Sequence, residues 1–62
     1  MKYQKMIETV TKIARAYKQY GKMDDYKSAV EHLYILIEKQ YKYYDLEYNT
    51  DMIRTDVNWL LS

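Results

Sequence analysis

The segment GKMDDY, residues 21–26, divides this chain, because Gly21 is its only glycine and it contains no proline. Glycine readily adopts the left-handed conformation that ends a helix. Asp24 or Asp25 can then accept the free amide groups at the start of a second helix. A turn of about four residues between two helices makes them antiparallel. The segment therefore predicts a helical hairpin.

Apolar residues recur at helical spacing on both sides of this turn. Before it, steps of three and four form one stripe, widened by Ile7 and Ala14: Tyr3, Met6, Val10, Ile13, Tyr17 and Tyr20. After it, three rows with steps of seven form one broad face: Tyr26, Leu33 and Gln40; Val30, Ile37 and Tyr44; Tyr34, Tyr41 and Tyr48. These patterns predict helices over residues 2–20 and 25–48.

A third, shorter helix is predicted over residues 50–61, where cap-type residues precede a new apolar side. Asn49 and Thr50 suit a helix start, and the apolar side that follows contains Ile53, Val57, Leu60 and Leu61. This helix would close the open side of the hairpin. The predicted fold is all-α, a small three-helix unit that forms a single domain over residues 1–62.

The turn segment also resembles the turn of a tetratricopeptide helix pair. Gly21 and Met23 stand near the positions where that motif places its glycine and an aromatic residue. The resemblance covers one hairpin, and no second copy follows at the required period. It therefore implies shared turn geometry alone.

The composition is that of a globular chain, with 48% hydrophobic and 31% charged residues among 62. A chain this short buries only about 60% of the surface that its unfolded form exposes, so its stability is marginal. There is no cysteine and only one histidine, which removes disulfides and most zinc sites. We therefore expect association with another chain to contribute stability.

The longest apolar run, residues 33–37, is far shorter than the roughly 20 residues that span a bilayer. The first residues mix lysine with polar side chains and do not form the apolar core of a signal peptide. We expect a cytoplasmic location.

No residue pattern of an enzyme is present. His32 stands without a serine or cysteine nucleophile beside it, and the chain has no glycine-rich phosphate loop and no metal-ligand spacing. We expect neither catalysis nor a cofactor.

Charge is distributed unevenly along the chain. Residues 1–22 contain six basic side chains and one acidic one, a net charge of +5, whereas residues 23–62 contain four basic and eight acidic ones, a net charge of −4. The candidate contacts to nucleic acid or to an acidic partner are Lys5, Lys12, Arg15, Lys18 and Lys22. The alternative is a solvated helix face.

The chain has nine tyrosines and no phenylalanine. The rings on the apolar face are expected to form mostly the core or wall of the hairpin, and hydroxyl groups at their rim suit a binding surface. A row of carboxylates, Glu31, Glu38 and Asp45, runs beside the third tyrosine row. Tyr43 lies outside the apolar rows, and Trp59 lies on the side of Met52, so both are candidates to face outward. The alternative is that these rings pack the third helix onto the hairpin, since a lone tryptophan near a chain end often seals a small core. The predicted partner-binding residues are Tyr34, Glu38, Tyr41, Tyr43, Asp45, Tyr48 and Trp59.

The favoured hypothesis is a small non-enzymatic protein–protein interaction module. By analogy of type, short cysteine-free chains of this kind include accessory proteins of phages and mobile elements. Some of these, such as anti-CRISPR proteins, are stoichiometric inhibitors of a larger host nucleic-acid enzyme. Two alternatives are a homodimer that binds nucleic acid through the basic face of the first helix, and a purely structural homo-oligomer.

Overall fold

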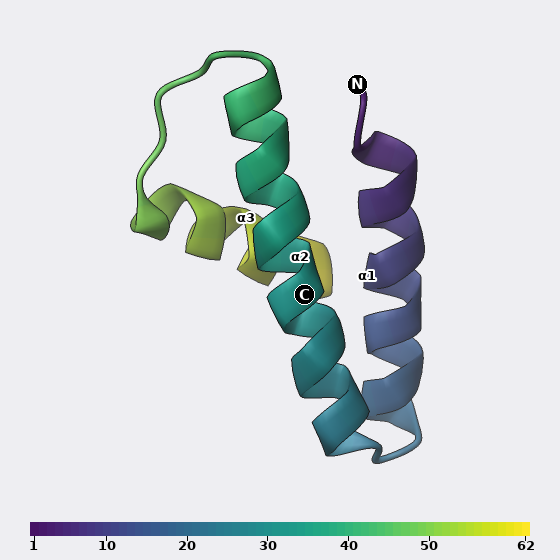
Figure 1. Cartoon of the computed structure of the whole chain (residues 1–62). Helices are drawn as coiled ribbons and strands as arrows, with labels where there is room; N and C mark the ends of the chain where they lie inside the picture. The colour runs from purple at the N-terminus through teal and green to yellow at the C-terminus, as the bar shows by residue number, and fades with distance from the viewer.

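The computed structural model covers Met1–Ser62 and consists of three helices without strands, as predicted. They are α1 (Gln4–Gln19), α2 (Met23–Tyr43) and α3 (Thr50–Leu61), which together hold 79% of the residues. Helices α1 and α2 form an antiparallel pair, and α3 crosses behind α2 in Figure 1. The all-α prediction is confirmed.

The hairpin turn is a Schellman motif centred on Gly21, whose φ is 73°. The Lys22 amide donates to the Tyr17 carbonyl at 2.8 Å, and the Gly21 amide donates to the Lys18 carbonyl at 3.2 Å. These two bonds satisfy carbonyl groups at the end of α1 that have no partner within the helix. Gly21 therefore ends the first helix in the way the sequence predicts.

The predicted start of α2 is wrong in one respect. The helix begins at Met23 with Lys22 as its N-cap, and no side chain accepts a hydrogen bond there. Asp24 and Asp25 lie inside the first turn, where their charges stabilise the positive end of the helix without acting as caps.

We expect Gly21→Ala to lower the free energy of unfolding by about 1 kcal/mol, because alanine disfavours a positive φ. A Cβ atom at this position would meet nothing within 4 Å, so the cost is in the backbone alone. Urea denaturation followed by circular dichroism measures it. The matched control is Gly21→Asn, which tolerates the left-handed conformation and should lose less. Equal losses for both variants would contradict this explanation.

Helix α2 ends at Tyr43, earlier than the predicted end at residue 48. A second Schellman motif stops it: Asp45 has a φ of 54°, and the Leu46 amide donates to the Tyr41 carbonyl at 3.0 Å. Tyr48 consequently lies in the loop before α3. That helix begins as predicted, since the Asn49 side chain accepts a hydrogen bond from the Met52 amide at 2.9 Å.

The core joins all three helices. Its six buried residues are Ile7 from α1, Leu33, Leu36 and Ile37 from α2, and Ile53 and Val57 from α3. Leu33 and Val57 are its largest fully buried side chains. All three helices therefore contribute side chains to the same buried cluster.

Helix α1 packs through one edge of the predicted stripe, the edge on which Ile7 and Ala14 widen it. Ile7, Thr11 and Ala14 are buried, and the Thr11 hydroxyl donates to the Ile7 carbonyl at 2.7 Å. In the predicted stripe, Met6, Ile13 and Tyr20 are exposed. The stripe therefore runs along the edge of the α1–α2 contact, and part of it faces outward.

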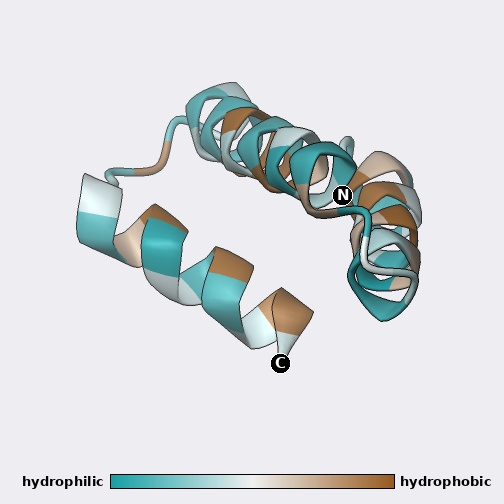
Figure 2. Cartoon of the chain, turned by 90° about the horizontal axis from the view of Figure 1, so that it is seen from below, coloured by the Kyte–Doolittle hydropathy of each residue, from teal (hydrophilic) through white to brown (hydrophobic).

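Helix α3 covers only one side of the α1–α2 pair, as Figure 2 shows from below. On this side the Arg15 guanidinium donates to the Leu60 carbonyl at 2.8 Å, which links α1 to the last turn of α3. The opposite side of the pair has no third helix over it. No helix in the chain has the length and apolar content that a membrane crossing requires.

Candidate functional site

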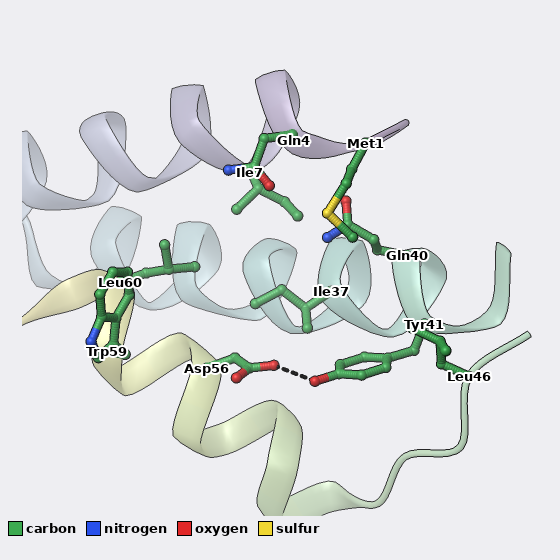
Figure 3. A pocket seen from close by; sticks show the side chains of 10 residues that line it. All are labelled: Met1, Gln4, Ile7, Ile37, Gln40, Tyr41, Leu46, Asp56, Trp59 and Leu60. Carbon is green, nitrogen blue, oxygen red and sulfur yellow. Dashed lines mark hydrogen bonds between the residues drawn. The ribbon is translucent and has the colours of Figure 1, made fainter. Parts of the chain in front are cut away.

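A cleft of about 420 Å³ lies where the start of α1, the second half of α2 and α3 meet (Figure 3). This volume is within the range of sites that take a small molecule or an inserted side chain. Seven of its ten lining residues are hydrophobic: the lining consists of Met1, Gln4, Ile7, Ile37, Gln40, Tyr41, Leu46, Asp56, Trp59 and Leu60.

One hydrogen bond connects the two walls of the cleft. The Tyr41 hydroxyl on α2 donates to a carboxylate oxygen of Asp56 on α3 at 2.7 Å (Figure 3). The ring of Tyr48 stacks on that of Tyr41, with centroids 5.7 Å apart and planes at 28°. The loop and α3 are therefore both held to α2 through Tyr41.

The hydrogen bond to Asp56, the partial burial of the ring and the nearby carboxylate charge together raise the pKa of Tyr41 above its usual 10.0. The folded state thus holds this proton more tightly than the unfolded state. The resulting stability is complete below about pH 10 and is lost as the pH rises above that value, where the unfolded chain ionises first.

We expect Tyr41→Phe to lower the free energy of unfolding by about 1 kcal/mol at neutral pH, because it deletes this hydrogen bond. The difference from the wild-type chain should shrink between about pH 9 and pH 11. Urea denaturation across that range measures it. The control is Tyr34→Phe, since the Tyr34 hydroxyl donates no hydrogen bond within the chain. A difference that stays constant with pH would contradict the assignment.

The cleft also contains an unpaired acceptor. The Gln40 side-chain oxygen is buried and has no hydrogen-bond partner within the chain. Buried polar atoms are normally paired, and leaving one unpaired costs roughly 1–3 kcal/mol. A bound group that donates a hydrogen bond would remove that cost if the Gln40 side chain turned its oxygen toward the cleft.

Large apolar side chains at the edge of the cleft are exposed. Trp59 is 77% exposed and Leu46 is 51% exposed, and Met1 lies at the far side from Trp59. The Trp59 indole stands beside Leu60 at one end of the cleft in Figure 3. Exposed tryptophan next to an apolar hollow is typical of a binding surface.

The structure brings three of the predicted partner-binding residues together: Tyr41 and Trp59 line the cleft, and Tyr48 stacks on Tyr41. Tyr34 is half-buried and packs against the core. Asp45 lies beyond the end of α2 and so leaves the predicted carboxylate row. Glu38 forms a surface ion pair with Lys42 at 3.7 Å.

Tyr43 is separate from the cleft, because residues two apart on a helix project about 200° from each other and Tyr41 faces α3. Its ring meets Tyr3 edge-on at 6.2 Å and Tyr44 at 4.9 Å between centroids. The Lys2 ammonium group lies 4.8 Å from the centre of the Tyr43 ring. Tyr43 is 56% exposed, in agreement with its predicted outward position.

Two of the five predicted cationic contacts are engaged within the fold. Arg15 binds the Leu60 carbonyl, and the Lys18 ammonium lies 5.8 Å from the centre of the Tyr26 ring. The other three are exposed and form no ion pair: Lys5, Lys12 and Lys22.

Sequence reasoning did not select Gln40, Leu46 or Asp56 for the cleft. Two of them can be recognised in the sequence, because each is a polar residue at a position where apolar spacing continues. Gln40 follows Leu33 by seven residues, and Asp56 follows Ile53 by three. A polar residue at a core-facing position indicates a site or a buried hydrogen bond. Leu46 had no such signal, because its position depends on the end of α2.

The acidic and imidazole side chains do not gather in groups of three or more that could hold a metal ion. The fold and the cleft define a small all-α protein with a mostly apolar hollow between its helices, lined in part by Tyr41 and Trp59. Comparisons with protein-family models, curated proteins and solved structures gave no match for this chain.

Proposed function

We propose that this chain is a protein-binding module whose partner inserts an apolar side chain into the cleft between α1, α2 and α3. The observation that carries the proposal is the exposed Trp59 beside a hollow with seven hydrophobic lining residues. Exposed aromatic residues around a concave apolar surface supply most of the affinity in many protein interfaces.

The polar atoms of the cleft define what the partner should carry. The Asp56 carboxylate accepts a hydrogen bond from Tyr41, the Gln40 oxygen is an acceptor without a partner, and no lining residue is a lysine or arginine. A partner segment that pairs an apolar side chain with a hydrogen-bond donor fits this arrangement. A backbone amide or a lysine beside the inserted residue would supply the donor.

An inhibitor of a nucleic-acid enzyme is a narrower form of this proposal. It requires an acidic edge that meets a basic channel. With Asp45 outside the helical row, that edge consists of Glu31 and Glu38, and Glu38 is paired with Lys42. We therefore propose protein binding without specifying this role.

The test is affinity capture from host extract with the tagged chain and two matched variants. Leu46→Glu places a charge at the cleft edge, whereas Ile35→Glu places one at a similarly exposed position away from the cleft, 53% against 51% exposed. We expect a protein captured by the wild-type chain to be retained by Ile35→Glu and lost with Leu46→Glu. Capture that survives both substitutions, or no specific capture, would contradict the proposal.

A further inference from the structure

The side of the α1–α2 pair opposite α3 carries a second apolar surface, which we call the open face. It consists of Met6, Val10, Ile13 and Tyr17 on α1, above a shallow groove of about 260 Å³ that also touches Ala29 and His32 on α2. Ile13 is 43% exposed although it belongs to the apolar stripe of its helix. The buried contacts of α1 use the neighbouring row of Ile7, Thr11 and Ala14. Val10 is half-buried against the core, and the outer part of the stripe, including Met6 and Ile13, is exposed and has no third helix over it.

The spacing of this stripe suits packing against another helix. Its residues follow steps of three and four with a seven-residue repeat, which is the seam of a coiled coil. Thr9 and Ala16 stand beside the seam and are small and uncharged, so a second helix can approach closely. Lys5 and Lys12 project roughly 110° or more from the middle of the stripe and do not obstruct it.

The seam is complementary to itself when two copies run antiparallel. About a centre between Val10 and Ile13, Val10 of one copy faces Ile13 of the other, and Met6 faces Tyr17. Tyr3 then faces Tyr20 at each end. Branched aliphatic residues meet each other in the middle, a methionine sulfur meets an aromatic ring further out, and two aromatic rings meet at the ends. A parallel arrangement would instead set Met6 against Met6 and Tyr17 against Tyr17.

Charges at the two ends of the open face agree with the antiparallel arrangement. Lys2 lies at one end, with its ammonium group over Tyr43. Asp25 lines the groove at the other end. It lies five helical turns before Tyr43, at about 3.6 residues per turn, so both side chains project from the same side of α2. An antiparallel two-fold axis brings Lys2 of each copy to the level of Asp25 of the other. A parallel pairing would bring the like charges together.

From the seam and the charges at its ends, we infer that the open face binds a second copy of this chain, giving an antiparallel two-fold dimer with α1 against α1. The inference is independent of the proposed function, because the cleft lies on the side of α3 and stays open in such a dimer. Each dimer would present two clefts facing away from each other.

The first test measures molar mass by sedimentation equilibrium from micromolar to millimolar concentration. We expect a mass near twice 7.7 kDa that falls on dilution. Ile13→Glu should raise the dissociation constant at least about 30-fold, while Trp59→Glu, a matched change on α3, should leave it within about twofold. Circular dichroism confirms that both variants remain folded. A chain that is monomeric throughout, or a dimer lost with Trp59→Glu and kept with Ile13→Glu, would overturn the inference.

The second test exchanges the charges. Asp25→Lys should weaken the dimer about five- to tenfold, and adding Lys2→Glu to it should restore most of the loss. The control is Asp24→Lys, which removes the same charge from the first turn of α2 at a position outside the groove. We expect it to change the dissociation constant by no more than about twofold. No recovery in the double variant would overturn the antiparallel arrangement.

Discussion

Leu33→Ala is expected to lower the free energy of unfolding by about 3–4 kcal/mol and to leave much of the chain unfolded at 37 °C. The side chain is fully buried and belongs to the cluster that joins Ile7 of α1 to Ile53 and Val57 of α3. A core this small contributes only about 3–5 kcal/mol of net stability, so one cavity removes most of it. Urea and thermal denaturation at a fixed protein concentration measure the loss.

The matched control for this prediction is Ile35→Ala on the same helix. It removes a similar side chain from a position that is 53% exposed, and it should change the free energy of unfolding by less than about 1 kcal/mol. Similar losses for the two variants would contradict the role of burial, because alanine has the higher helix propensity and propensity cannot explain a loss at either position. A small loss for Leu33→Ala alone would mean that the three helices do not share the core described here.

The number and type of the helices could be predicted because each rests on local signals. Gly21 supplies the positive φ of the first turn, and the Asn49 side chain caps α3. Apolar spacing then marks each segment as helical. These signals operate within a few residues of the chain, so they do not depend on how the helices pack.

The packed face of α1 is only partly evident from hydrophobicity: apolar spacing places Ile7 and Ala14 at the edge of the stripe, but the third buried residue, Thr11, is polar. Small side chains let two helices approach closely and make a good contact without a large apolar area. The larger residues Met6 and Ile13 form the more conspicuous pattern, yet they are about half exposed, at 49% and 43%. Size complementarity with α2, which one helix alone does not reveal, selects the face.

The cleft depends on two features that a periodic pattern does not contain. Asp45 adopts a positive φ and ends α2 before the apolar rows are complete, which moves Leu46 and Tyr48 into a loop. The hydrogen bond between Tyr41 and Asp56 then fixes where α3 crosses. Sequence reasoning reached Tyr41, Tyr48 and Trp59 through their aromatic character, but not the polar atoms that accompany them.

Exposure now separates two roles that the sequence left open for Trp59. A lone tryptophan near a chain end could seal the small core, and truncating it would then cost about 3 kcal/mol or more of stability. Here the side chain is 77% exposed and lies at the edge of the cleft. It therefore contributes little to the folded chain by itself and is available to a partner.

Trp59→Ala is accordingly expected to weaken binding of the cleft partner by about 2 kcal/mol or more, roughly 30-fold in the dissociation constant. The free energy of unfolding should change by less than about 1 kcal/mol, because few contacts are lost. Titration calorimetry with the captured partner, beside urea denaturation of each variant, measures both quantities.

The control is Tyr43→Ala, which removes another exposed ring from the other side of α2. It should leave binding at the cleft unchanged, since Tyr43 contacts Tyr3 and Lys2 and lies outside the cleft. Equal weakening by both substitutions would show that the partner also covers the side of α2 that carries Tyr43. Unchanged binding by Trp59→Ala would contradict the cleft as the partner site.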